Sequence, residues 1–467
     1  MSRLHTLVAG RRLWLVGGIA MLLGLALRLW LAFGVFLDQG FAWDISTFGD
    51  WLLAIQNTDT DAYFTDPGFN YPPAFADVLW ALLQLGNLAS GLPEPLNAIS
   101  AITLLKAPAI LADIGIAATL LWIGRKWFDD KIALIASSLY LFIPVTWYDS
   151  AIWGQVDSLS ALPMLLAVAF VIDRKPEWSA VALTVAVLMK PQGALVVLIL
   201  LPVLLGQLRR KELRWRRFAT TIAAGIGAFT LIAVPWSLEA FAPESLQGIP
   251  VVGDFVGLVG QYVGTLGLFP VLTANAYNPW ILAGLEPISR NIQYGTAFWI
   301  PDSYPILGVP SSLIGNGLFL ILVGFIFWML LRKSAPMTVF TGYALLLFGF
   351  YILPTRVHER YLVQAFAVLA IVWAVKLKDR ILLVVLSVAN TLNLHAILVE
   401  DLDVQTIELN DVNSAPAGPV AWVAQFTKAV FGSNPEDFGI GWVRGDATLA
   451  RAEWMVWLIV AVQTALF

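Results

Sequence analysis

The sequence predicts an all-α polytopic membrane protein that forms a single domain over residues 1–467. The composition is the first observation behind this prediction: 59% of the 467 residues are hydrophobic and only 13% are charged, with a mean hydropathy of +0.77. A water-soluble chain of this length needs far more polar surface. The other two observations are a series of long apolar runs and the uneven distribution of basic residues among the loops that join them.

The apolar runs predict about 12 transmembrane helices. Several runs are shorter than the roughly 20 residues of a straight span, which is typical of helices that break around a cavity. The first follows Arg11 and Arg12 without a small-residue cleavage site, so we expect an uncleaved signal-anchor. The runs cover residues 13–36, 99–122, 131–147, 156–173, 177–189, 191–206, 218–236, 311–331, 337–353, 361–375, 381–398 and 452–466.

The charges on the loops predict the topology. Residues 37–98 include several Asp and one Glu but no Lys or Arg, which is typical of a loop on the non-cytoplasmic face. The apolar stretch 73–89 inside this loop is ambiguous; if it lies along or dips into the membrane, most of the 28 basic residues fall on short inner loops. We therefore expect both chain ends inside and outer loops at 37–98, 237–310 and 399–450. The basic run 209–217 is then an inner anchor that contacts anionic membrane lipids.

Six polar motifs fall on the predicted outer face. Random placement would divide them between the two faces, so their common location favours one outward-facing site. The motifs are Phe41-Ala-Trp-Asp44, Asn70-Tyr-Pro-Pro73, Trp153-Gly-Gln-Val-Asp-Ser158, Lys190-Pro-Gln192, Asn275-Ala-Tyr-Asn-Pro-Trp280 and Val357-His-Glu-Arg-Tyr361.

These motifs combine carboxylates with cations close to the membrane. Ionisable groups near hydrocarbon are costly and usually mark function. Cations there favour an anionic ligand such as a phosphate, and a carboxylate opposite them could act as a general base. The chain has no Cys and three His, which excludes a Cys nucleophile and a thiolate metal site. The cations are Arg28, Lys106, Lys190 and Arg360, with Arg356 and His358 nearby; the carboxylates are Asp44, Asp157 and Glu359.

Taken together, the motifs resemble those of the GT-C glycosyltransferases, and within them the prokaryotic relatives of the PIG-V-type mannosyltransferase. The pair Trp153-Gly-Gln-Val-Asp157 and His358-Glu-Arg-Tyr361 is the most specific part of the resemblance. It implies a GT-C fold with re-entrant or interfacial helices in the first outer loop. It also implies an inverting transfer of a hexose, with mannose the first candidate, from a polyprenyl-phosphate sugar to a glycolipid, glycan or protein acceptor. No nucleotide, nucleic acid or cofactor is expected.

The resemblance also implies roles for individual residues. Asp44 matches the acidic residue that acts as base on the acceptor hydroxyl, and nearby cations would assist departure of the lipid phosphate. Asn70 stands where an Asp often precedes Tyr-Pro-Pro, which argues against a paired carboxylate and against a divalent metal. The expected donor-phosphate residues are Lys190, His358, Arg360, Lys106 and Arg28. The expected substrate contacts are Gln155, Asp157, Gln192, Asn275, Asn278 and Tyr71.

Other interpretations of these residues stay open. Asp157 could orient Gln155 or Lys190, or begin a helix as an N-terminal carboxylate. Arg28 and Lys106, expected a turn or more inside helices, could simply extend toward the interface. Asp113 lies deeper still, where we expect a buried hydrogen bond between helices. A different class of protein, a transporter or flippase for an anionic lipid-linked sugar, would place its ionisable residues near the bilayer midplane. Because they gather at one face, we favour an enzyme of a prokaryotic plasma membrane with its site outside.

Overall fold

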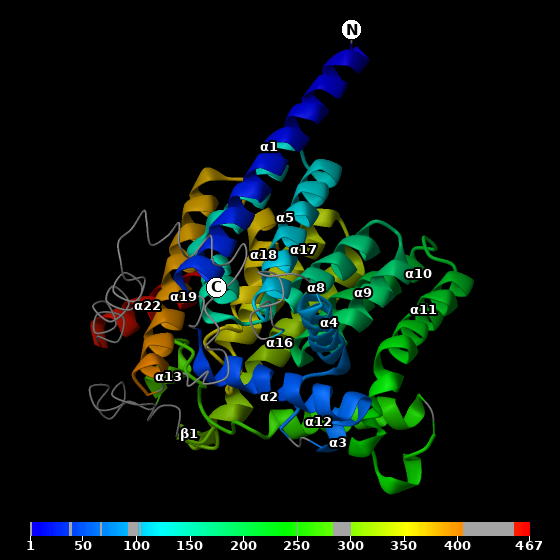
Figure 1. Ribbon diagram of the computed structural model, residues 1–467. Helices are drawn as coiled ribbons and strands as arrows, with labels where there is room; N and C mark the ends of the chain where they lie inside the picture. Colours follow the sequence, from blue (N-terminus) through cyan, green and yellow to red (C-terminus); the bar gives the residue numbers. More distant parts are fainter. Residues whose placement is uncertain are drawn as a thin grey trace.

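The computed structural model describes residues 2–36, 40–65, 68–91, 101, 104–249, 251–283, 300–404 and 453–467, and these residues are almost entirely helical (Figure 1). One short antiparallel hairpin, β1 (Pro305–Ile306) and β2 (Val309–Pro310), precedes a long helix. The predicted all-α class is confirmed.

The helices follow the predicted apolar runs closely. The α-helices are α1 (Ser2–Trp30), α2 (Ala42–Thr58), α3 (Ala62–Thr65), α4 (Pro73–Ser90), α5 (Ala107–Trp127), α6 (Asp130–Phe142), α7 (Pro144–Trp147), α8 (Asp157–Ile172), α9 (Pro176–Met189), α10 (Val197–Arg209), α11 (Trp215–Ala233), α12 (Val252–Leu266), α13 (Trp280–Ala283), α16 (Ser311–Arg332), α17 (Pro336–Ile352), α18 (Val363–Val372), α19 (Leu377–Val404) and α22 (Glu453–Leu466). Two π-helical segments, η1 (Leu31–Val35) and η4 (Tyr148–Trp153), and several 3₁₀ turns join them: η2 (Asp59–Asp61), η5 (Pro191–Val196), η6 (Val234–Trp236), η7 (Leu238–Phe241) and η8 (Glu244–Leu246).

Several of these helices have the length and composition of membrane spans. Within the described residues, 6 helices are long and apolar enough to cross a membrane, and α6 with Pro144–Trp153, bent by 51°, makes a possible seventh. Only 17% of the most apolar stretch of α16 is buried, although its hydropathy is 2.3. Apolar surface of this kind is stable against lipid but not against water. The chain is therefore an integral membrane protein. Shorter apolar helices occupy most of the remaining predicted spans: Asp157–Ile172, Pro176–Met189, Pro336–Ile352, Val363–Val372 and Trp454–Leu466.

Helices α8 and α18 form the centre of the bundle. Residues 363–371 of α18 are all buried, and so is most of α8, which packs against α5, α9 and α18. A helix that is apolar on every side belongs in such a core. Each of these two helices directly follows a polar motif, so the packing of α8 against α18 brings those two motifs to the same region.

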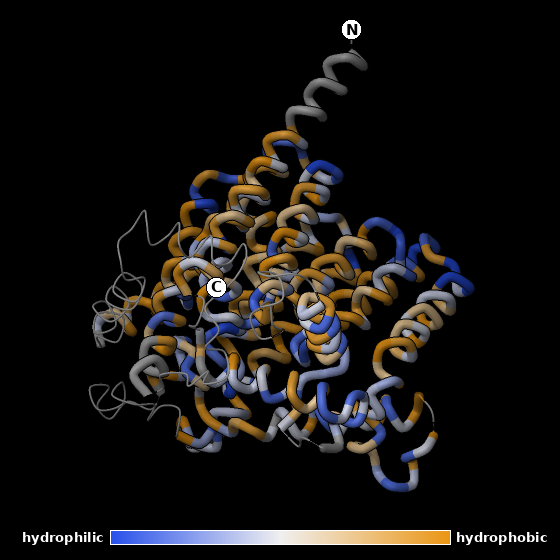
Figure 2. Tube along the Cα trace, viewed as in Figure 1, coloured by the Kyte–Doolittle hydropathy of each residue, from blue (hydrophilic) through white to orange (hydrophobic). Residues whose placement is uncertain are grey.

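Helix α2 lies across the end of the bundle opposite the N-terminus (Figure 1) and shares an apolar cluster with α12. Phe48, Trp51, Leu52 and Ile55 are buried along one face of α2, at the spacing of an amphipathic helix. They belong to an apolar cluster that includes Phe75 of α4. This packing fixes the first turn of α2, which carries Asp44. Figure 2 shows hydrophobic residues along the bundle and hydrophilic residues in the connection between α10 and α11.

The structure corrects some predicted boundaries. Helix α5 begins at Ala107 and not near residue 99, with Pro108 in its first turn, where a missing N–H costs little. Lys106 is therefore the N-cap residue and not a residue inside a helix. Residues 399–404 belong to α19, and the rest of the predicted outer loop 399–450 lies outside the described residues. Helix α4 covers the ambiguous stretch 73–89 and is not among the candidate spans; that this stretch does not cross the membrane stays a prediction.

Candidate functional site

The first turn of α2 is tied to the end of η4. The Phe41 N–H donates to the carbonyl oxygen of Trp153 at 2.9 Å, and the two rings stack at 4.4 Å between centroids. Asp44 lies in this first turn, where the helix dipole favours a carboxylate. The backbone of the first polar motif is thus fixed against the backbone of the third.

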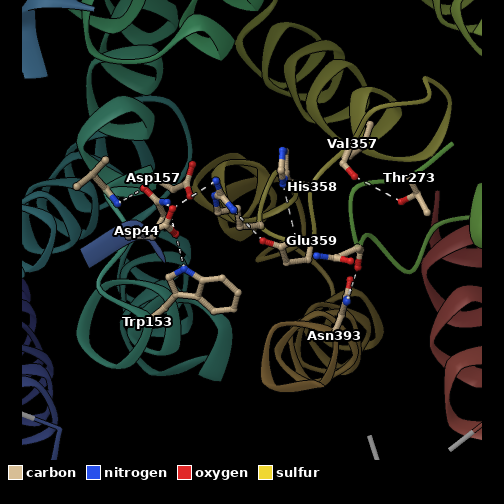
Figure 3. Close-up of polar contacts among 12 residues, drawn as sticks. Asp44, Trp153, Asp157, Thr273, Val357, His358, Glu359 and Asn393 are labelled. Atoms are coloured by element: carbon tan, nitrogen blue, oxygen red, sulfur yellow. Dashed lines mark hydrogen bonds and ion pairs between the residues drawn. The ribbon is translucent and has the colours of Figure 1, made fainter. Parts of the chain in front are cut away.

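Asp44 is held by one of its two carboxylate oxygens. Trp153 Nε1 and Gln155 Nε2 each donate to Oδ2 at 2.8 Å. The other oxygen, Oδ1, lies 3.8 Å from the Arg360 guanidinium. The Asp44 side chain keeps 15% of its surface exposed, so a substrate can reach it. Figure 3 shows Asp44 facing Trp153, with Asp157 beside it.

A tight turn presents Gln155 to Asp44. The π-helical segment η4 ends at Gly154, whose φ of +85° favours glycine, and the Asp149 carbonyl accepts the N–H groups of Gly154 and Gln155. A Cβ added at Gly154 would lie 2.6 Å from the Ile45 side chain. The glycine therefore allows both the turn and the close approach of α2.

Lys190 and Asp157 form a buried ion pair. Lys190 follows the last turn of α9 and precedes Pro191, and its Nζ lies 2.7 Å from Asp157 Oδ1. The two side chains are only 2% and 0% exposed. Gln364 of α18 donates to the same Asp157 oxygen at 3.2 Å, and Lys190 also stands 5.4 Å over the Tyr71 ring. Lys190 thus has protein partners already, including the carboxylate that the sequence suggested it could pair with.

The His-Glu-Arg-Tyr segment is held by the long loop 271–280 and by α19. The Ala274 N–H donates to the Val357 carbonyl at 2.9 Å, and Thr273 Oγ1 approaches the same oxygen (Figure 3). Asn390 of α19 donates to the Glu359 carbonyl at 3.1 Å. Glu359 in turn accepts from Arg360 at 2.8 Å. Within the described part of the chain, Arg360 Nε is buried without a hydrogen-bond acceptor.

Burial makes His358 a neutral residue. The pKa of His358 is well below its usual value, first because burial penalises the imidazolium and then because Arg360 and Lys190 repel it. The expectation of a cationic His358 is therefore corrected: at neutral pH the ring offers one N–H donor and no charge. Burial also raises the pKa of its neighbour Glu359. The His358 ring packs edge-on against Phe269 at 5.0 Å between centroids.

The structure brings most of the predicted site residues together. Tyr71 Oη approaches Gln155 Oε1 at 3.5 Å, which adds the second polar motif to the cluster. Lys106 donates to the Phe36 carbonyl at 2.8 Å and is only 6% exposed, and a Cβ at Gly154 would lie 3.4 Å from its Cε. We call the following residues the polar cluster: Asp44, Tyr71, Trp153, Gln155, Asp157, Lys190, Glu359, Arg360 and Gln364.

Arg28 lies in a separate buried network. Its Nε donates to Asp113 Oδ2 at 2.7 Å, and its other nitrogens reach the Gly24 and Leu141 carbonyls and Thr146. The side chain is 0% exposed. This placement corrects the expectation that Arg28 contacts a donor phosphate, because a ligand cannot reach a guanidinium enclosed by helices. The alternative prediction for Asp113, a buried hydrogen bond between helices, is confirmed.

The remaining predicted amides have different surroundings. Asn278 is fully buried, donates to the Tyr351 carbonyl at 3.0 Å and accepts from the Trp280 N–H at 3.2 Å, so it holds the loop and does not face a substrate. Asn275 has a φ of +67°, and its carbonyl accepts from Asn393 at 2.9 Å. Gln192 lies in η5, and its Oε1 is buried without a partner among the described residues.

Three residues of the polar cluster, Trp153, Glu359 and Gln364, were not predicted as site residues. Trp153 and Glu359 lie in two of the polar motifs, and the Trp153 indole N–H donates to Asp44. Gln364 is the one polar residue of the otherwise apolar helix α18, and this isolated polar position is the sequence signal that could have identified it as a site residue. No three His, Asp or Glu side chains in the described ranges converge as metal ligands do. The expectation of a metal-independent reaction stays a prediction.

Comparisons with known proteins give distant structural likenesses. No family model matches the chain, and no curated protein matches its sequence. The chain is similar to the apo oligosaccharyltransferase of Archaeoglobus fulgidus, with 12% identity and a TM-score of 0.42 over 96% of this chain and 56% of that one. For the oligosaccharyltransferase AglB from the same organism, in complex with an inhibitory peptide and a dolichol-phosphate, the identity is 15% and the TM-score 0.38, with the same coverage.

A third solved structure, the Archaeoglobus fulgidus enzyme tethered to an acceptor peptide, has 14% identity and a TM-score of 0.37 over 85% of this chain and 47% of that one. The chain therefore spans about half the length of the solved structures that it matches. TM-scores below 0.5 do not establish a common fold. The described helices themselves define the class, an all-α polytopic membrane protein, and its function is inferred from the polar cluster.

Proposed function

We propose that this protein is a GT-C glycosyltransferase that moves a hexose, with mannose the first candidate, from a polyprenyl-phosphate sugar to a lipid, glycan or protein acceptor. One observation carries the proposal: a partly exposed carboxylate, Asp44, lies 3.8 Å from a guanidinium, Arg360, at one end of an apolar bundle. A base and a phosphate-binding cation in one site next to lipid are the two groups that transfer from a lipid phosphate needs. The resemblance of the motifs to those of GT-C enzymes supports the same conclusion.

Asp44 is the proposed general base. Its Oδ1 takes the proton of the acceptor hydroxyl as the acceptor oxygen forms a bond to the sugar C1. The two hydrogen bonds to Oδ2 hold the carboxylate in place while leaving Oδ1 for this proton. Attack on the face opposite the phosphate inverts the configuration at C1.

Arg360 and His358 are the proposed phosphate partners. The bond from C1 to the phosphate oxygen breaks, and its electron pair leaves on the lipid phosphate. Arg360 stabilises that charge and has an Nε without an acceptor among the described residues, while the neutral His358 supplies one N–H. Lys106 adds positive charge near Gly154. Arg28 is not a proposed phosphate partner because it is enclosed by helices. Lys190 is not one either, because it is already paired with Asp157.

The charge of the loops supports a site on the outer face of the membrane, which we propose is a prokaryotic plasma membrane. The polar cluster lies toward the end of the bundle that carries α2, and the segment around α2 contains Asp but no Lys or Arg. The basic connection between α10 and α11 belongs, by the same rule, to the inner face.

Labelled-sugar transfer tests the proposal directly. Purified protein is incubated with polyprenyl-phosphate [³H]mannose and a membrane lipid extract, beside the variant Asp44→Asn. We expect labelled product from the wild type and a loss of at least about 10³-fold in the variant, because Asn cannot accept the proton. Polyprenyl monophosphate should quench Trp fluorescence of both proteins with the same affinity.

Each other outcome contradicts a defined part of the proposal. Equal product from wild type and Asp44→Asn would keep the glycosyltransferase and remove Asp44 as the base. Absence of product from the wild type, with polyprenyl monophosphate moved between leaflets of a vesicle instead, would favour the flippase.

A further inference from the structure

The hydrogen bonds decide how the Gln155 side chain is turned. Its Oε1 lies 2.8 Å from the Val156 N–H and 3.4 Å from Lys190 Nζ. A backbone N–H and an ammonium group are donors only, so the atom between them has to be the amide oxygen. The amide NH₂ is then forced toward Asp44, where it donates to Oδ2 at 2.8 Å.

Because Gln155 is buried, the reversed orientation of its amide is energetically unfavourable. Gln155 is 0% exposed, so water cannot replace a lost partner. If the amide turned over, its NH₂ would meet two donors and its oxygen would meet a carboxylate. Each mismatch leaves a buried polar group unsatisfied, which is costly. The amide is therefore locked.

The Lys190–Asp157 ion pair also holds the Gln155 amide in this orientation. Lys190 Nζ lies 3.4 Å from Gln155 Oε1 but 2.7 Å from Asp157 Oδ1, so Asp157 is its main partner. Gln364 of α18 in turn donates to Asp157. Lys190 meets the amide oxygen of Gln155 and Asp44 meets its NH₂, and both side chains of the ion pair are enclosed. A cation enclosed and neutralised in this way is a poor phosphate ligand but a rigid support.

We infer that Lys190 and Asp157 are positioning residues that act through Gln155 to turn the Asp44 carboxylate, so that Oδ2 is occupied and Oδ1 faces the acceptor. This inference rests on the proposed base role of Asp44. It reassigns Lys190, which the sequence places among the phosphate ligands. Misplacement of a reacting group by about 1 Å can cost about 10²-fold in rate, so the pair controls kcat and not donor binding.

The variant Gln155→Glu tests the contact without an assay of activity. Two carboxylate oxygens at the distance between Gln155 and Asp44 need a shared proton, so the introduced carboxyl has a raised pKa in the folded state. A group whose pKa is higher in the folded state than in the unfolded state stabilises the fold fully at pH values below its unfolded-state pKa. This contribution is lost as the pH rises through the folded-state pKa. We therefore expect the thermal midpoint of Gln155→Glu to fall, relative to the wild type, between about pH 5 and about pH 9.

Two background variants identify the partners. The extra fall of the thermal midpoint with pH should disappear in Asp44→Asn/Gln155→Glu, because the introduced carboxyl no longer faces a second carboxylate. The same fall of the thermal midpoint should be smaller when Lys190→Met and Asp157→Asn are added to Gln155→Glu, because the introduced side chain is no longer held toward Asp44. The matched control is Gln207→Glu, another buried Gln, which donates to the Val171 carbonyl in a different part of the bundle. Its pH dependence should not respond to Asp44→Asn.

Kinetics then separate positioning from phosphate binding. In Lys190→Met/Asp157→Asn, which removes both buried charges together, kcat with polyprenyl-phosphate mannose should fall about 10²-fold while KM changes less than about threefold. Gln155→Glu should recover activity toward acid pH, where the introduced carboxyl is protonated and donates as the amide did.

Two results would overturn the inference. One is a Gln155→Glu pH dependence that persists unchanged in the Asp44→Asn background. The other is a Lys190→Met/Asp157→Asn protein that keeps its kcat or binds polyprenyl monophosphate at least about tenfold more weakly, which would return Lys190 to the phosphate. Absence of mannose transfer by the wild type would instead contradict the proposed donor, and the stability measurements would still decide the contact.

Discussion

At the scale of single residues, the site depends on what each polar group already has as a partner. Asp44 has two donors on one oxygen and an approachable second oxygen, while Lys190 is enclosed by Asp157, Gln155 and Tyr71. Both are charged residues in polar motifs of the chain, and only their partners distinguish a group that can meet a substrate from one that supports it. Charge alone does not assign a role.

Gly154 offers a residue-scale prediction. We expect Gly154→Ala to destabilise the protein by about 1–2 kcal/mol, because an L-residue is strained at a φ of +85°. The added methyl also meets Ile45 and displaces the start of α2, so the rate of transfer should fall too. Thermal unfolding in detergent and the mannose transfer assay measure the two effects. The control Gly317→Ala, in α16 with open space around it, should leave both unchanged or slightly raise stability. Equal stability of the two variants would show that the turn tolerates a side chain.

At the scale of elements, helices of the bundle carry polar residues that hold the two loops of the site. Asn390 and Asn393, one turn apart on α19, donate to the carbonyls of Glu359 and Asn275. Residues three apart on a helix lie on one face, so a single helix positions both loops. The pair stands out as polar in the apolar run 381–398, but the sequence does not identify its partners.

The Arg28–Asp113 pair is a prediction at this scale, because it joins α1 to α5. Arg28→Met alone should cost about 3–5 kcal/mol, since Asp113 is left buried and unpaired. Arg28→Met/Asp113→Asn should recover most of that stability, because the amide oxygen of Asn accepts from Tyr140 and its NH₂ can donate to the Ser150 hydroxyl. Thermal unfolding measures both variants, and the double variant should bind polyprenyl monophosphate like the wild type. Weaker binding by a folded double variant would return Arg28 to the donor site.

At the scale of the whole molecule, the bundle places its acidic and basic connections at different ends. The segment around α2 is acidic, and the connection between α10 and α11 is basic and hydrophilic (Figure 2). The positive-inside rule therefore predicts, as the proposed function requires, that the polar cluster faces outward.

Single-cysteine labelling tests this orientation, because the natural chain has no Cys. Ser46→Cys, on the exposed side of α2, should react with a membrane-impermeant maleimide in intact cells. Lys211→Cys, in the exposed α10–α11 connection, should react only after the membrane is permeabilised. The opposite pattern would reverse the topology and place the polar cluster on the cytoplasmic face.

The class of protein, most helix positions and the set of motifs that meet follow from the sequence, because apolar runs, loop charges and isolated polar residues are local signals. The pairing of Asp157 with Lys190 and the buried Asp113 were also among the interpretations of the sequence. The contacts of the folded chain were needed to show which cations are enclosed, that burial lowers the pKa of His358 and that Trp153 and Gln364 belong to the cluster. Partners and burial arise from contacts between segments far apart in the chain, such as α2 with η4 and α8 with α18. A side chain's role follows from those contacts, and residue type alone does not contain them.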